Sequence, residues 1–195
     1  MQAALIRALV ALAFLPAPAF AFTAYVTNEK GNSVTILDTE KMEAVRTLAV
    51  GKRPRGILVS PDGTRLYVCA SDDNVIQVFD TKSMELVARI PTSDPEQIAL
   101  SPDGTRLYVA NEDDNLVSIF DVQTRKSVAE VPVGVEPEGV AVSPDGRTIV
   151  ATSETTNMAH FIDAAARKVV GNVLVGARPR FAYFSPTGSE LWVSS

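Results

Sequence analysis

The chain has 195 residues, of which 46% are hydrophobic and 21% are charged, and its 18 Lys and Arg against 23 Asp and Glu give a formal net charge of -5. This composition is typical of a globular protein, and the acidic balance argues against a general nucleic-acid binder, which would carry a basic stripe. The one cysteine, Cys69, excludes an internal disulfide framework and paired-cysteine zinc or haem motifs. The one histidine, His160, excludes multi-histidine metal sites.

The first 21 residues have the pattern of a secretory signal segment. Arg7 supplies a positive charge, residues 8–15 form an apolar run, and Ala19-Phe20-Ala21 matches a small-residue cleavage site. The run is shorter than the about 20 residues that cross a bilayer. The sequence therefore predicts a signal peptide over residues 1–21, cleavage after Ala21 and export, to the periplasm in a Gram-negative source. A buried first helix is the alternative, and no later segment has the length of a membrane span.

From residue 22 onward the chain repeats about every 42 residues. The same landmarks recur in the same order: a Tyr-Val pair or its equivalent, an asparagine, an aspartate, and a Ser-Pro-Asp-Gly turn or its Ser-Pro-Thr-Gly variant. The turns begin 41, 42 and 42 residues apart, at Ser60, Ser101, Ser143 and Ser185. The asparagines are Asn32, Asn74, Asn115 and Asn157. A period this regular indicates stacked copies of one supersecondary unit.

Each repeat has the pattern of four short strands. In one repeat the expected strands are residues 139–143, 148–152, 158–162 and 169–175, and turn-forming residues such as Pro144-Asp145-Gly146 separate them. No helical period is present, and four antiparallel strands in about 42 residues is the size of one propeller blade. The sequence therefore predicts an all-β fold, a β-propeller of four-stranded blades.

The chain resembles a known repeat family. Tyr25-Val26-Thr27-Asn28 is the sequence that names the YVTN β-propeller repeat, and the Ser-Pro-Asp-Gly turn belongs to the same repeat. Residues 153–163, 178–181 and 192–195 are similar to YVTN-propeller proteins associated with PQQ-dependent alcohol catabolism. This resemblance implies a seven-bladed exported propeller linked to quinoprotein alcohol oxidation and a transport operon, without a defined molecular activity.

The length of the repeat region predicts an incomplete ring. Residues 22–195 hold slightly more than four repeats, so we expect an arc of about four repeats from a seven-bladed propeller, with three full blades and a partial blade at each end. Closure of four blades into a ring is the alternative, but it would leave Trp192 to Ser195 redundant.

Charged residues flank an aligned proline just before the innermost strand of each blade, in a segment that we call the lead-in loop. The eight residues are Arg53, Arg55, Asp94, Glu96, Glu136, Glu138, Arg178 and Arg180. Proline fixes φ, so these charges are expected on one defined rim of the central channel. Arginine suits carboxylate and phosphate groups, and the rim is therefore a candidate site for a small anionic molecule or a periplasmic protein partner. Salt bridges between neighbouring blades are the alternative.

Other polar residues carry a weaker signal. Glu112, Asp113 and Asp114 offer oxygen ligands for calcium, but no D-x-D-x-D-G loop follows, so we interpret them as turn formers. His160 has no second histidine or thiol to partner it and is interpreted as a strand side chain, and Cys69 as a small core residue. The sequence therefore predicts no metal, no cofactor and no catalytic residue.

Two functions remain open from the sequence. The first is an exported, non-enzymatic binding or interaction protein, accessory to periplasmic PQQ-dependent alcohol oxidation or associated transport. The second is a lactonase-like hydrolase, because some related propellers are lactonases. Hydrolysis would require a metal or a positioned base, and no such group of residues stands out. A quinoprotein dehydrogenase is disfavoured, since Trp192 is the one tryptophan.

Overall fold

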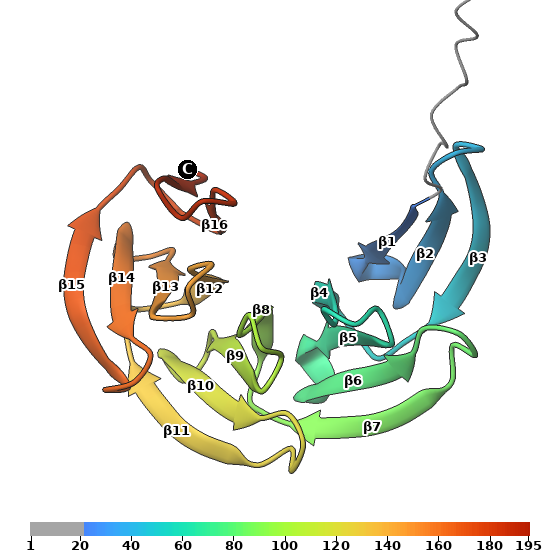
Figure 1. Cartoon of the computed structure of the whole chain (residues 1–195), viewed down its shortest axis with the longest axis horizontal. Coiled ribbons are helices and arrows are strands. Elements are labelled where there is room, and N and C mark those ends of the chain that lie inside the picture. The colour runs from blue at the N-terminus through green and yellow to red at the C-terminus, as the bar shows by residue number, and fades with distance from the viewer. Residues whose placement is uncertain (1–21) are drawn as a thin grey trace, which may run out of the picture.

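The computed structural model describes residues 22–195, so the predicted signal segment lies outside the described residues. Successive antiparallel sheets stand side by side around an open arc (Figure 1). The three complete blades are β4 (Pro54–Val59), β5 (Arg65–Ala70), β6 (Val75–Asp80) and β7 (Leu86–Pro91); β8 (Pro95–Leu100), β9 (Arg106–Asn111), β10 (Leu116–Asp121) and β11 (Ser127–Pro132); and β12 (Pro137–Val142), β13 (Thr148–Ser153), β14 (Met158–Asp163) and β15 (Lys168–Leu174).

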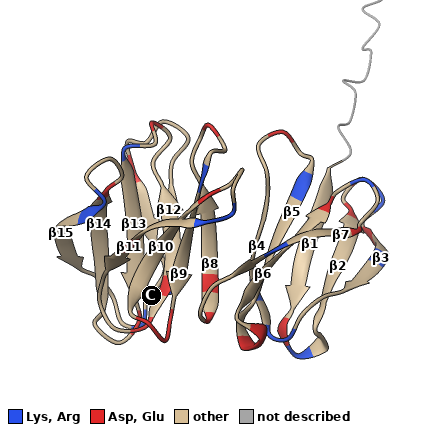
Figure 2. Cartoon of the chain, turned by 90° about the horizontal axis from the view of Figure 1, so that it is seen from below, with Lys and Arg blue, Asp and Glu red and all other residues tan. Residues whose placement is uncertain are grey.

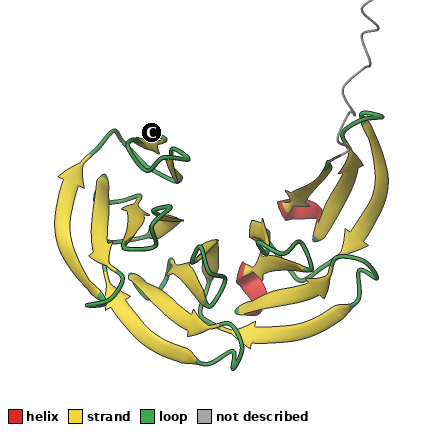
Figure 3. Cartoon of the chain, viewed as in Figure 1, coloured by secondary structure: helices red, strands yellow, loops and turns green. Residues whose placement is uncertain are grey.

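Partial sheets stand at both ends of the arc. The partial sheets are β1 (Thr23–Asn28), β2 (Ser33–Asp38) and β3 (Glu43–Ala49), and β16 (Ala182–Phe184) with β17 (Leu191–Val193). The short 3-10 turns η1 (Glu29–Gly31) and η2 (Ser71–Asp73) each join the second strand of a blade to the third (Figure 3). The predicted all-β fold, the four-stranded blades and the incomplete arc are confirmed.

The innermost strands β4, β8, β12 and β16 face the centre of the arc, and β3, β7, β11 and β15 form its outer rim (Figure 1). The observed strands agree with the expected ones to within one or two residues. The largest difference is that β12 begins at Pro137, two residues before the expected start. No helix within residues 22–195 has the length and apolarity needed to cross a membrane.

The core lies between blades rather than inside any one of them. Side chains alternate along β5, so Leu66 packs against the preceding sheet and its neighbour Tyr67 packs against the following blade. Both faces of this strand are therefore buried. Cys69 is fully buried on the same face as Tyr67, as predicted for a small core residue, and burial raises the pKa of its thiol.

The Ser-Pro-Asp-Gly turns connect β4 to β5, β8 to β9 and β12 to β13. In the second turn the Ser101 hydroxyl and the Thr105 backbone N–H both donate to Asp103 Oδ1, at 2.6 and 3.0 Å, and these bonds lower the pKa of Asp103 to about 2. Gly146 has a φ of 72°, which suits glycine, and a Cβ there would lie 3.2 Å from Pro102 Cδ of the preceding turn. Turns of neighbouring blades therefore stack on each other.

The recurring asparagine connects each blade to the next. Asn115 has a φ of 57°, its carbonyl accepts the Val133 N–H, and its side-chain Oδ1 accepts the Glu136 N–H at 3.0 Å. Glu136 itself has a φ of 57°, directly before Pro137. Equivalent bonds join Asn32 to Arg53, Asn74 to Asp94, and Asn157 to Arg178. The asparagine is thus a turn residue, as expected, and it also holds the strained residue before each proline.

Replacement of Asn115 separates its two roles. Asn115→Gly keeps a backbone suited to positive φ but removes the acceptor for Glu136, so we expect a loss of about 1 kcal/mol in the free energy of unfolding. Asn115→Ala also strains the left-handed backbone, and its total loss should reach about 2–3 kcal/mol. Urea unfolding measures both values. If the glycine variant is as stable as the parent protein, the side-chain bond does not stabilise the fold.

Candidate functional site at the channel mouth

The eight predicted rim residues lie at the same end of the blades, one before and one after each aligned proline. The first charged residue of each pair is a left-handed residue before proline, as Arg53 is with a φ of 50°. The second charged residue lies inside the innermost strand in three of the four pairs, whereas Arg180 precedes β16. Arg55, Glu96 and Glu138 therefore belong to strands rather than to loops. Their side-chain direction is set by the strand pleat.

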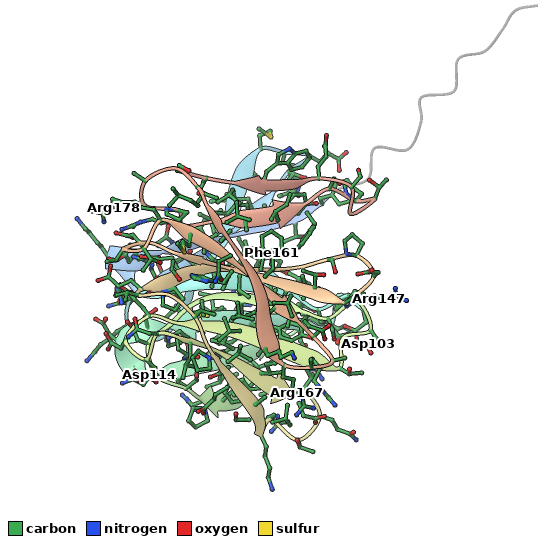
Figure 4. The ribbon with its side chains drawn as sticks, turned by 90° about the vertical axis from the view of Figure 1, so that its left-hand side faces the viewer. Asp103, Asp114, Arg147, Phe161, Arg167 and Arg178 are labelled. Atoms are coloured by element: carbon green, nitrogen blue, oxygen red, sulfur yellow. The ribbon has the colours of Figure 1, made fainter. Side chains whose placement is uncertain are left out.

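The lead-in loops and the loops between second and third strands share one face, as predicted. Figure 4 shows Arg178 and Asp114 at one side of the molecule and Asp103 and Arg147, from the Ser-Pro-Asp-Gly turns, at the opposite side. In Figure 2 the charged residues gather mainly at the loops and strand ends, while the middle of the blades is largely uncharged. The channel mouth is thus an end of the arc where two sets of polar loops meet.

Arg53 is the centre of the first ionic cluster. Its Nη1 lies 3.0 Å from Asp94 Oδ1 and 3.2 Å from Glu96 Oε1, and its Nη2 lies 3.4 Å from Glu112 Oε2. Two more exposed carboxylates approach the same guanidinium, those of Glu29 and Asp72. One arginine therefore contacts five carboxylates, each from a different loop or strand.

Arg55 extends the ionic contacts across the next two blades. Its Nε lies 2.6 Å from Glu96 Oε2, and its Nη2 lies 3.0 Å from Glu138 Oε2. Glu138 in turn lies 3.8 Å from Arg180, which also pairs with Glu154 at 2.6 Å. The ion pairs form a continuous chain along the innermost strands.

Seven of the eight predicted residues take part in ion pairs. The last arginine, Arg178, pairs with Glu154. The exception is Glu136, whose carboxylate accepts a hydrogen bond from the Thr155 hydroxyl. The salt bridges between blades that the sequence left as an alternative are present.

Four further carboxylates belong to this network, although the sequence singled out none of them as a rim residue. They are Glu29, Asp72, Glu112 and Glu154. All lie in loops between second and third strands, which share the face of the lead-in loops. Counting them, four arginines meet seven ion-paired carboxylates. The ionic network therefore carries an excess of three formal negative charges when every group in it is ionised.

Burial perturbs the central carboxylates. Glu96 is only 1% exposed, and this burial raises its pKa to about 8, although Arg55 and Arg53 oppose the shift. Burial also raises the pKa of Glu138, where Glu154 adds to the effect, and the pKa of Asp94. A proton on Glu96 reduces the excess negative charge, so the network takes up protons near neutral pH.

Three of these carboxylates have the spacing of a metal-ligand set. Oxygen atoms of Asp94, Glu96 and Glu112 lie within 4.8 Å of one another. The guanidinium of Arg53 contacts all three residues, and it therefore occupies the position that a cation would take. Arginine is always charged and offers several fixed donors. Arg53 donates hydrogen bonds to Asp94 and Glu112, whereas Glu96 Oε1 is buried without a hydrogen-bond partner.

Two cavities adjoin the network. One of about 680 Å³ opens beside Arg53 and is lined in part by Lys52, Asp72 and Asp94. The other, of about 550 Å³, lies along the innermost strands below the ionic chain, and its lining is mainly apolar, with Phe181 at one side. The charged space thus opens at the mouth, whereas the apolar one extends along the innermost strands to Pro144 and Pro186 of the turns at the opposite end.

His160 and Cys69 do not belong to this site. His160 lies on β14, where Nε2 accepts the Gly134 N–H at 3.1 Å and Nδ1 lies 2.8 Å from Asn172 Oδ1. Both ring nitrogens are engaged, so the ring has no free lone pair for base catalysis. Cys69 is buried in the core. The two residues occupy the strand and core positions predicted for them.

Comparison with known proteins agrees with this architecture. Residues 12–130 and 51–173 each match the family described as lactonase, 7-bladed beta-propeller. The chain belongs to this lactonase family. Among solved structures it is similar to hydrazine synthase of Kuenenia stuttgartiensis, with 30% sequence identity and a TM-score of 0.81 over 88% of this chain. The match covers 51% of the hydrazine synthase chain, so the present chain spans about half of that protein's length. The search of curated proteins found no match to the present chain.

The raised pKa of Glu96 predicts a pH-dependent stability. Because the folded pKa of about 8 exceeds the ordinary value of 4.5, Glu96 favours folding below about pH 4.5 and loses this contribution as the pH rises towards 8. We expect the melting temperature of the parent protein to fall more steeply between pH 5 and 8 than that of Glu96→Gln. A carboxyl-carbon NMR titration should place the Glu96 midpoint near 8.

Asp103 provides a control with the opposite sign. Its pKa is lowered to about 2, so its contribution is present above pH 3.8 and is lost only as the pH falls towards 2. Asp103→Asn should therefore leave the slope between pH 5 and 8 unchanged. A Glu96 midpoint near 4.5 would contradict the assignment.

Proposed function

We propose that this protein is an exported, non-enzymatic β-propeller whose channel mouth binds a positively charged surface of a periplasmic protein partner. The observation that carries the proposal is the excess of seven carboxylates over four arginines in the ionic network. The sequence left two partners open, a small anion and a protein. An anion would have to displace carboxylates that already hold the guanidiniums, so the charge balance supports the protein.

Exposed acids at the mouth are available to such a partner. The side chains of Glu29 and Asp72 are 50% and 55% exposed. Asp72 reaches Arg53 only at 3.9 Å, and Glu29 lies 3.7 Å from Arg53 and 3.3 Å from Arg55. Solvent-exposed pairs of this kind contribute about 0–1 kcal/mol, so a basic surface can compete for them at small cost. Complementary charge also steers association over about 8 Å at physiological ionic strength.

We also propose a periplasmic location and an accessory role for this protein. The similarity of residues 153–163, 178–181 and 192–195 to PQQ-associated YVTN propellers supports a role accessory to quinoprotein alcohol oxidation or associated transport. The pattern of residues 1–21 supports export to the periplasm. Cell fractionation with N-terminal sequencing tests export, and the expected mature N-terminus is Phe22. A cytoplasmic protein that retains Met1 would overturn it.

Charged probes test the binding mode. In calorimetric titrations at low salt, we expect hexalysine to bind, and hexaglutamate and PQQ to give no binding heat. Glu29→Gln with Asp72→Asn should weaken hexalysine binding about 5-fold, because each neutralised contact contributes about 0.5 kcal/mol. Glu40→Gln with Glu43→Gln is the matched control, since it removes two exposed negative charges around the turn between β2 and β3.

Two results would contradict this binding mode. Tighter binding of PQQ or hexaglutamate than of hexalysine would show that the arginines, and not the excess acids, recognise the ligand. Equal loss of hexalysine binding in both double variants would show attraction to the net charge of the protein rather than to the mouth.

A lactonase-like hydrolase remains the second candidate, supported by the family and by the raised pKa of Glu96. A hydrolytic base must reach water and substrate. Glu96 is 1% exposed and both of its oxygens face arginines, which favours binding over hydrolysis.

Lactone hydrolysis provides the direct comparison between the two candidates. With aliphatic γ- and δ-lactones, with and without EDTA, we expect rates equal to the uncatalysed background for the parent protein and for Glu96→Gln. Turnover that disappears in Glu96→Gln or on chelation would replace the binding proposal with a hydrolase.

A further inference from the structure

His160 fastens the link between two complete blades. The link, residues 133–136, joins β11 to β12, and the Gly134 N–H in this link donates to His160 Nε2 at 3.1 Å. On the other side of the ring, Nδ1 lies 2.8 Å from Asn172 Oδ1 on β15. An amide oxygen only accepts, so Nδ1 carries the proton and Nε2 is the bare acceptor. The contact thus requires a neutral imidazole.

The backbone of the link lies close against the ring. A Cβ added to Gly134 would meet Nε2 at 2.5 Å and would also meet the Thr156 hydroxyl. His160 itself is 6% exposed. This close packing leaves the Gly134 N–H no alternative acceptor on the ring unless the link moves away from His160.

We propose that His160 is a proton-sensitive latch on this link. Protonation places a hydrogen on Nε2, so that two N–H donors face each other and the hydrogen bond to Gly134 is lost. The link stays bonded to Asn115 at Val133 and Glu136, so the change is centred on Gly134. The loosened link leads directly into Glu138, a member of the ionic network. Acidification therefore loosens one side of the channel mouth. This inference does not depend on the proposed binding function.

No neighbouring charge compensates a protonated ring. The cavity beside His160 is lined by uncharged residues, namely Pro132, Val133, Gly134, Thr156, Met158, Val169 and Asn172. Two acids in the adjoining loops have other partners, since Glu136 accepts from Thr155 and Glu154 pairs with Arg178 and Arg180. Among residues 22–195 no carboxylate forms an ion pair with His160.

The chain contains a matched latch that cannot titrate. Gln77 occupies the equivalent position on β6, where it pairs with Arg89 of β7 as His160 pairs with Asn172 of β15. Its Oε1 accepts the Gly51 N–H of the preceding link at 2.7 Å. A glutamine amide keeps the same acceptor over the whole physiological pH range. Gly51 is therefore an internal control in every measurement.

Amide hydrogen exchange of the full chain tests the latch. Between pH 8 and pH 5 we expect the protection factor of Gly134, relative to intrinsic exchange at each pH, to fall at least tenfold, while that of Gly51 stays constant. His160→Gln should make Gly134 behave like Gly51. On the parent protein alone, the Nε2 nitrogen shift and the Gly134 amide proton shift should titrate with one midpoint.

Clear outcomes would overturn the proposal. Equal protection of Gly134 at pH 5 and 8 in the parent protein would show that no latch opens. A fall that persists in His160→Gln, or an equal fall at Gly51, would assign the loosening to another group. If the variant does not fold, different midpoints for the His160 nitrogen and the Gly134 amide in the parent protein would still exclude the mechanism.

Discussion

Burial of both faces of each blade is the constraint on which the structure depends. On β5, Leu66 and Tyr67 are neighbours in sequence, yet they belong to the cores on opposite sides of the blade. Since no blade can bury both faces alone, the blades stack side by side, and the strand twist arranges them in an arc. The innermost strands then converge on one axis, and everything attached to their ends meets at the channel mouth (Figure 1).

This convergence explains the electrostatics of the mouth. Arg55 and Glu138 are 83 residues apart, yet their side chains pair at 3.0 Å because both occupy the second position of an innermost strand. Burial raises the pKa of Glu96 to about 8, so this group binds a proton, and the excess of acids over bases leaves exposed carboxylates at the edge of the network. Arginines at this site act first as counter-ions for the propeller's own acids, and the family resemblance to lactonases does not change that arrangement.

One position of the repeat holds glutamine in one blade and histidine in another. Position 77 and position 160 perform the same structural task, since each accepts the backbone N–H of a link glycine. Glutamine performs it independently of pH, and histidine only while neutral. In the proposed latch, histidine at this repeat position gives the link between β11 and β12 a pH-sensitive hydrogen bond, whereas glutamine gives the equivalent link before β4 a pH-independent one.

The sequence by itself determined the blades and the face on which the charges gather, because a 42-residue period with alternating apolar residues and fixed turns is a local pattern. The eight rim positions followed from the aligned prolines. The partners of those charges were decided only by the tertiary structure. Glu29, Glu112 and Glu154 lie outside the eight rim positions, and their pairing with arginines depends on distances between different blades. The sequence did not predict the role of His160 for the same reason. Gly134, whose N–H donates to His160, is 26 residues away and precedes a different strand, and spacing along the chain does not give the distance between two such residues.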